Sequence, residues 1–204
     1  AIHLGVSLTD LPVRLDNHLV RVDLTYPRRT SEDGQIDYDW WGVGWSTETE
    51  GYWPADHPLA GAESLEDFPW PDPRDLHLMD DAKETIFREG SQYFVAPNLG
   101  FCLFERAWSL RGFEPLLMDL ALDLAFAEEL LERITEIQVA LARRFVALGV
   151  DGGYFGDDYG AQRGLLFSPR TWRTMFKPRL ARLFAVFRDE DLPVILHSDG
   201  DIAE

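Results

Sequence analysis

Cysteine is nearly absent from the sequence, and two further features are missing altogether. The single cysteine, Cys102, excludes an internal disulfide bond and is typical of a reducing cytosol, so we expect a cytoplasmic protein. No apolar run approaches the roughly 20 residues that a membrane-spanning helix needs, and we therefore expect no membrane segment. The first residues also lack the basic and then apolar pattern of a secretory signal peptide.

Basic residues are scarce as well. The 204 residues include 19 Lys and Arg against 36 Asp and Glu, which gives a formal net charge of −17. This balance argues against a nucleic acid or an anionic membrane surface as a partner held by general electrostatics. Hydrophobic residues make up 46% of the chain. The sequence can therefore build a packed core, and it is not that of a disordered protein.

Periodicity predicts an α/β fold. Residues 123–148 carry one apolar stripe at helical spacing, formed by Phe126, Leu130, Ile134, Ile137, Leu141, Phe145 and Leu148. The apolar runs before Asp157 and before His197 are typical of buried strands. Between them, Ser168-Pro169 opens a predicted crossover helix, which we expect to kink or break near Pro178. A strand, a helix and a strand in this order predict a βαβ unit with parallel strands.

Residues 27–80 differ from the rest of the chain. They show little helical periodicity and contain five of the seven tryptophans, at positions 40, 41, 45, 53 and 70. We interpret this aromatic- and proline-rich region as loops and short strands over a satellite hydrophobic cluster; the alternative is a lid over a flat ligand. An eight-stranded barrel takes about 250 residues. Because we count only four or five strands, we predict that residues 1–204 form one incomplete (β/α) domain.

Polar residues follow the ends of two predicted strands, where parallel α/β folds place their chemistry. His197 and Asp199 are two apart in a strand, so their side chains point to the same face. Asp157 and Asp158 are adjacent and must diverge, so only one of them is expected to face that cavity. Gln162 could reach it from the following loop. An imidazole and two carboxylates support proton transfer, or bind a divalent cation through nitrogen and oxygen.

A purely structural interpretation competes with this one. The two aspartates can cap the glycine-rich turn through hydrogen bonds to its backbone, and His197 can be a satisfied histidine at a strand end. For either cluster alone the structural interpretation is preferable. Two such clusters at consecutive strand ends favour a functional site. Cys102 is interpreted as a small buried hydrophobic residue.

Several short motifs together resemble the uroporphyrinogen decarboxylase superfamily, which includes the decarboxylase and corrinoid-dependent methyltransferases. The motifs are Gly156–Leu165, Ser168-Pro169, Lys177-Pro178 and His197–Gly200, supported by His57–Leu59, Trp70–Pro73, Phe104–Arg106 and Leu110–Gly112. Together these motifs cover the chain from about residue 39 onward. The resemblance implies a (β/α)8 TIM barrel of that type, present here in part, with a deep cleft at its C-terminal face.

The resemblance also implies a function. We expect an enzyme closer to the methyltransferases, which would move a methyl group between a small substrate or thiol and a corrinoid held by a partner protein. Asp157, Asp158, His197 and Asp199 would be catalytic, and Gln162, Tyr159 and Arg163 would bind substrate. The alternatives are decarboxylation of uroporphyrinogen, a tetrapyrrole, and a non-catalytic tetrapyrrole- or corrinoid-binding protein.

A zinc ion is the remaining implication. The methyltransferases carry His-x-Cys at the strand end that corresponds to His197, and a later cysteine completes a zinc site. Here Asp199 stands in place of the first cysteine. His197 and Asp199 could bind metal, but two thiolates suit a thiol-activating zinc better. We therefore predict weak or no zinc, and a hydrogen bond between His197 and a carboxylate instead.

Overall fold

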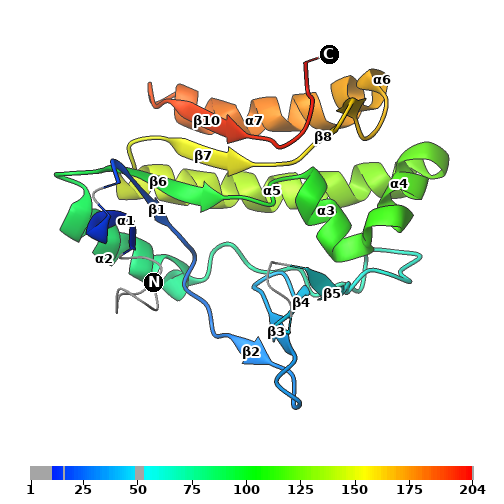
Figure 1. Cartoon of the computed structure of the whole chain (residues 1–204), viewed down its shortest axis with the longest axis horizontal. Helices are drawn as coiled ribbons and strands as arrows, with labels where there is room; N and C mark the ends of the chain where they lie inside the picture. Colours follow the sequence, from blue (N-terminus) through cyan, green and yellow to red (C-terminus); the bar gives the residue numbers. More distant parts are fainter. Residues whose placement is uncertain (1–10, 16, 49–52, 204) are drawn as a thin grey trace.

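The computed structural model describes residues 11–15, 17–48 and 53–203, and its centre is a parallel sheet (Figure 1). The strand order is β1 (Leu19–Val22), β6 (Phe94–Leu99), β7 (Gly153–Gly156) and β10 (Val194–His197). All three pairings are parallel, with Leu19 opposite Phe94 and His197 opposite Gly156. Among the described residues the sheet stays open, with β1 and β10 at its edges, as predicted for an incomplete barrel.

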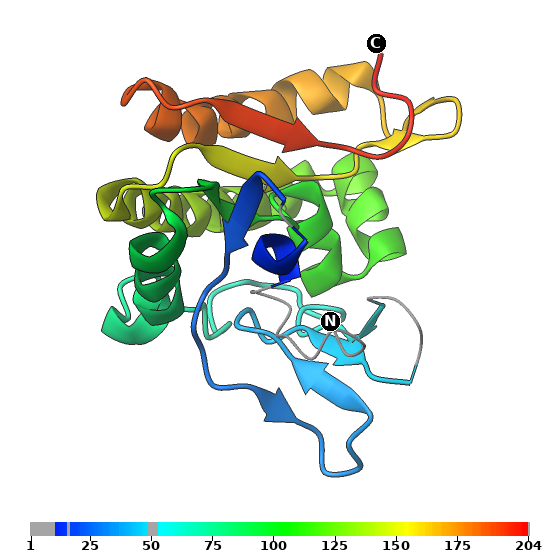
Figure 2. The same cartoon turned by 60° about the vertical axis from the view of Figure 1, so that its left-hand side comes forward.

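Helices cover one face of this sheet (Figures 1 and 2). α3 (Phe104–Arg111), α4 (Phe113–Leu122) and α5 (Leu124–Leu148) connect β6 to β7, and α5 packs against α7 (Lys177–Arg188). Phe155 of β7 points into this layer, where its ring contacts Phe184 and Phe187. α2 (Asp80–Glu89) packs beside β1 and directly follows the 3-10 turn η2 (Leu76–Met79). The short helix α1 (Leu11–Arg14) precedes β1 and contacts it.

The helix boundaries follow the expected signals. The Asp123 side chain accepts the backbone N–H of Phe126 at the start of α5, and Gly149, with φ +86°, ends the helix in the left-handed conformation. Ser168 caps α6 (Pro169–Thr171), and a π-helical turn, η3 (Trp172–Phe176), leads directly into α7. This irregular turn just before Pro178 is the break that the sequence predicted, because proline cannot donate to the helical ladder.

The aromatic-rich segment builds a second, antiparallel sheet. Its strands are β2 (Arg29–Thr30), β3 (Ile36–Tyr38), β4 (Gly44–Ser46) and β5 (Pro54–Asp56). Trp41 and Trp45 are buried in the main hydrophobic core, whereas Trp53 is 65% exposed. The tryptophans thus do not form one separate cluster. Among the described residues, no helix has the length and apolar character needed to cross a membrane.

Candidate active site

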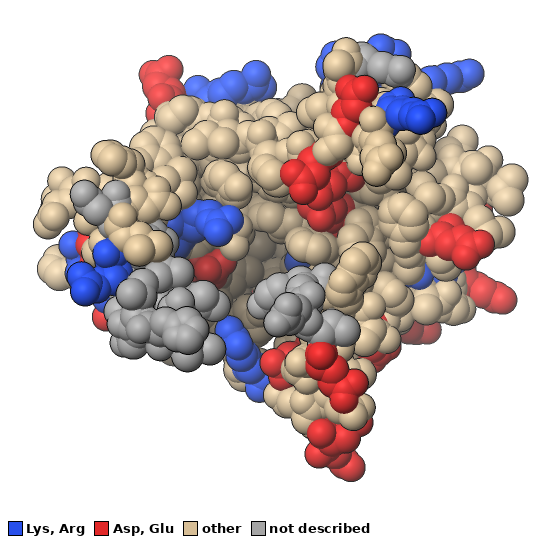
Figure 3. All heavy atoms as spheres, viewed as in Figure 1, with Lys and Arg blue, Asp and Glu red and all other residues tan. Residues whose placement is uncertain are grey.

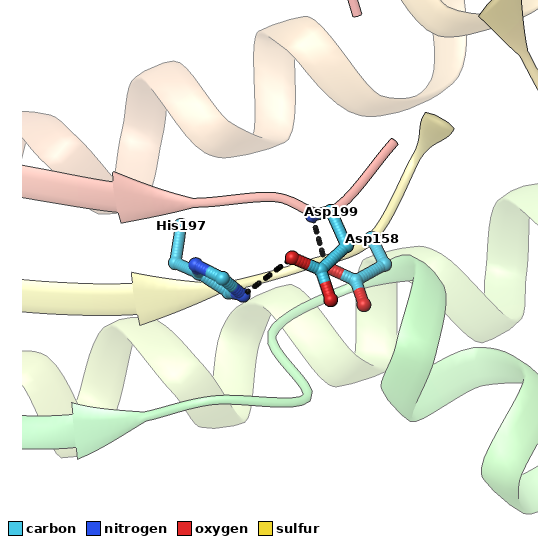
Figure 4. A group of neighbouring side chains, drawn as sticks. All are labelled: Asp158, His197 and Asp199. Carbon is cyan, nitrogen blue, oxygen red and sulfur yellow. Dashed lines mark hydrogen bonds and ion pairs between the residues drawn. The ribbon is translucent and has the colours of Figure 1, made fainter. Parts of the chain in front are cut away.

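Two loops at the carboxyl ends of β7 and β10 bring three polar side chains together (Figure 4). The imidazole Nε2 of His197 lies 3.3 Å from Oδ1 of Asp199, and the backbone N–H of Asp199 donates to Oδ1 of Asp158 at 2.7 Å. Ligand atoms of all three residues lie within 4.8 Å of one another. The predicted meeting of His197 and Asp199 with one of the two aspartates is thus what the structure shows.

Two of the three side chains are open to solvent, and Asp158 is half-buried. The side chains of His197 and Asp199 are 53% and 77% exposed. An exposed ion pair adds little to stability, so the fold does not depend on it. The arrangement is held instead by backbone contacts between the two loops, which leaves these side chains available for a ligand.

Two glycines make that loop contact possible. A Cβ atom on Gly160 would lie 2.7 Å from the backbone nitrogen of Asp201, and one on Gly200 would lie 2.5 Å from the backbone of Gly160. Gly200 also has φ +81°, a conformation that side chains disfavour. The N–H of Asp201 donates to the carbonyl of Ala161 at 2.8 Å. The glycine spacing of these loops therefore fixes Asp158 beside Asp199.

Asp157 points away from this group and is fully buried. Its carboxylate accepts the backbone N–H groups of Leu103, Phe104 and Glu105 at the start of α3, and it also accepts the hydroxyl of Tyr159. Burial raises the pKa of Asp157 to about 6, an increase that these four hydrogen bonds limit. The predicted catalytic position of Asp157 is corrected accordingly: it caps a helix, because its backbone direction turns it to the helical layer.

Tyr159 is also placed differently from the prediction. Its side chain is 2% exposed and packs among the rings of Phe104, Phe167 and Phe176. Burial, followed by the charge of Asp157, raises the pKa of the Tyr159 hydroxyl well above its ordinary value. We had expected Tyr159 to bind substrate, but its side chain does not border the open face. It packs instead at the junction of β7 and α3.

The other two predicted substrate-binding residues lie on a small hairpin. Gln162 and Arg163 connect β8 (Gly160–Ala161) to β9 (Gly164–Leu165), and both are exposed. The hairpin begins directly after the loop that carries Asp158. These side chains therefore stand next to the site without being part of the three-residue group.

Glu105 is the residue that sequence reasoning missed. In the sequence, Phe104–Arg106 stands out only as a family motif. In the structure Arg106 bonds Asp39 at 2.7 Å, and Glu105 lies near the two aspartates. Burial, then the charges of Asp157 and Asp158, raise the pKa of Glu105 to about 8. Its place in the first turn after β6 was the available signal, because that turn must face the carboxyl end of β7.

The donor set does not fit the zinc site that the resemblance implied. Asp158, His197 and Asp199 offer one nitrogen and carboxylate oxygens, and Asp158 already accepts a backbone hydrogen bond. Two thiolates are the softer set that zinc prefers for activating a thiol. The only cysteine of the chain, Cys102, is buried in the core, where burial raises the pKa of its thiol well above the ordinary value.

Comparison with known proteins agrees with this fold. Residues 98–204, more than half of the chain, match the family model described as uroporphyrinogen decarboxylase (URO-D). The chain therefore belongs to the uroporphyrinogen decarboxylase family. Comparison with curated proteins gives no significant match.

A solved structure extends the likeness to almost the whole chain. A methyltransferase from Methanosarcina mazei superposes with a TM-score of 0.69 at 18% sequence identity. The match covers 96% of this chain and 56% of that one, so the chain spans little more than half the length of its structural neighbour. At this identity the likeness shows the fold alone: the open sheet and its helices are part of a barrel of this type.

Proposed function

We propose that this protein is an enzyme of the methyltransferase-like branch, which transfers a methyl group between a small methylated substrate or thiol and a corrinoid. The observation that carries the proposal is the group of Asp158, His197 and Asp199 at the carboxyl ends of adjacent parallel strands. Active sites of (β/α) barrels lie at this end of the strands. The fold likeness to a methyltransferase supports it as an analogy.

The side chains suit the handling of a leaving group. When a methyl group departs from oxygen, nitrogen or sulfur, that atom keeps the bonding electron pair and needs a proton. The charged imidazole of His197 carries two N–H groups. Nε2 pairs with Oδ1 of Asp199 at 3.3 Å, which stabilises the charge and fixes the ring, and the proton at Nδ1 can be given to the leaving atom. The corrinoid would supply the acceptor for the methyl group. No step requires zinc.

The test is methylation of free cob(I)alamin, followed by its absorbance, with a panel of methyl ethers, methylamines and methyl thioethers. We expect His197→Ala and Asp158→Ala each to lower the rate at least about 100-fold, the lower range for loss of a proton-transferring group. His77→Ala is the matched control, because His77 is an exposed histidine paired with Asp80, in η2 outside the site. Activity that survives in His197→Ala would contradict the proposal.

Decarboxylation is the second candidate, and Glu105 is the observation that favours it. A carboxyl group with a raised pKa carries a proton at neutral pH. Such a group could protonate the carbon that loses CO₂, while Asp158 holds the protonated ring of the substrate. Release of CO₂ from uroporphyrinogen, without methylation of cob(I)alamin by any substrate of the panel, would replace the first proposal with this one.

A further inference from the structure

The face of the parallel sheet opposite the helices carries a second polar row. Val20 and Val22 of β1 are buried, so the alternating residues Arg21 and Asp23 point to the other face. In the register of the strands, Arg21 lies opposite Ala96, and Asn98 lies opposite Tyr154. His197, opposite Gly156, continues the same alternation on β7 and β10. Strand pleating thus places this row and the candidate active site on one surface.

Arg21 is a basic residue on the open face of the parallel sheet. Among the residues of the four parallel strands, all of them described, it alone carries a guanidinium or ammonium group. Its guanidinium carbon lies 5.3 Å from the centre of the Tyr154 ring, two strands away. The side chain reaches that far because Ala96, on the strand between, is small. Stacking on an aromatic ring holds the cation in place without neutralising it.

The neighbouring carboxylate is engaged elsewhere. Asp23 accepts a hydrogen bond from the Asn98 amide at 2.8 Å. No described carboxylate forms an ion pair with Arg21. In a chain with a formal net charge of −17, an arginine on a strand face that forms no ion pair with a described carboxylate is a candidate for binding an anionic ligand, since a guanidinium fork matches a carboxylate.

Tyr154, the ring that holds the Arg21 guanidinium, lies on the strand next to that of His197. Tyr154 and His197 are on adjacent strands and two residues out of register. With about 3.3 Å per residue and about 4.8 Å between strands, their Cα atoms are about 8 Å apart. Figure 3 shows a hollow on this face, with basic and acidic atoms side by side over β1 and β6 and a further acidic patch near the ends of β7 and β10.

We propose that Arg21, held over Tyr154, binds a carboxylate of the substrate while the methylated atom of the same molecule lies at His197. The inference rests on the proposed function and adds a substrate class: small methylated carboxylic acids. It assigns Arg21 as a residue that sets specificity through charge. The anchor and the reacting group would then hold two ends of one ligand on this face of the sheet.

The test compares 4-methoxybutyrate with its uncharged amide, 4-methoxybutyramide, by calorimetric binding. We expect the wild-type protein to bind the acid about 10- to 100-fold more tightly than the amide, the range for one charge-assisted pair. Arg21→Gln should abolish this preference, and Arg21→Lys should retain part of it. Arg133→Gln is the matched control, because Arg133 lies on the outer helix α5, exposed beside Glu136. Melting temperatures identify any variant that fails to fold.

The two proposals fail separately. Equal binding of acid and amide by the wild-type protein, a preference that survives in Arg21→Gln, or no binding of the acid would overturn the role of Arg21. His197→Ala should keep the preference for the acid, since the anchor lies apart from it. If binding follows this pattern while no methyl group reaches cob(I)alamin, the anchor stands and the proposed reaction is wrong.

Discussion

Asp157 and Asp158 are neighbours in the sequence and opposites in the structure. Asp157 is fully buried and bonds three backbone N–H groups of α3 and one hydroxyl. Asp158 lies just beyond the carboxyl end of β7, where its carboxylate accepts the backbone N–H of Asp199 in the loop after β10. The difference follows from the alternation of a strand end, which sends one carboxylate to the helical layer and the next to the open face. The same type of side chain therefore stabilises the fold at position 157 and belongs to the candidate active site at position 158.

The largest expected effect comes from removing the buried member of this pair. Asp157→Ala leaves three backbone donors and the Tyr159 hydroxyl without an acceptor inside the protein. Because unsatisfied buried donors are costly, we expect the free energy of unfolding to fall by about 3 kcal/mol. Urea unfolding measures it. Asp157→Asn keeps one acceptor oxygen and should lose less; equal stability of wild type and Asp157→Ala would refute the capping role.

Tyr159→Phe tests the buried contact of Asp157 by removing the hydroxyl that donates to it. The hydroxyl of Tyr159 donates to Asp157 within the core, and phenylalanine keeps the ring packing. Loss of one buried hydrogen bond to a charged group predicts a decrease of about 1.5 kcal/mol in the free energy of unfolding. The same denaturant titration checks this value. A double variant Asp157→Ala/Tyr159→Phe should lose less than the sum of the single changes, because the two residues share one interaction.

This pair also shows what the sequence could and could not predict. The parallel strands, the crossover helix and its break near Pro178 follow from periodicity and from local capping signals, which act over a few residues. The divergence of Asp157 and Asp158 was predictable from strand geometry, but its direction was not. That direction depends on where α3 begins, about 50 residues earlier in the chain. The roles of Tyr159 and Glu105 depend on the same long-range contact.

Glu105 makes the stability depend on pH. Its pKa is raised from 4.5 to about 8, so between these values the folded state binds more protons than the unfolded state. Stability contributed in this way is present at low pH and is lost as pH rises toward 8. Asp157 contributes in the same direction, but only up to about pH 6. From pH 6 to 8 the wild-type protein should therefore lose stability, and Glu105→Gln should lose less.

Urea unfolding at pH 6, 7 and 8 measures this slope. Glu84→Gln provides the control, because Glu84 is an exposed glutamate on α2, 3.8 Å from Arg88. It removes a charge of the same sign away from the aspartates. An identical pH dependence in wild type and Glu105→Gln would show that Glu105 does not carry the proton, and would remove the main support for the decarboxylase alternative.

The smallest expected effect is the increase in stability on metal binding at the candidate active site, to which Asp158 belongs. Asp158, His197 and Asp199 have the spacing of metal ligands, but they are solvent-accessible and lack a thiolate. We therefore expect weak binding, with less than stoichiometric zinc after dialysis. If the dissociation constant is about 100 μM, zinc at that concentration raises the free energy of unfolding by only about 0.4 kcal/mol. His197→Ala should abolish this increase, and Asp157→Asn should keep it, since Asp157 faces the helical layer. Elemental analysis that finds stoichiometric zinc in the wild type and none in His197→Ala would make these residues a metal centre and reverse the role proposed for His197.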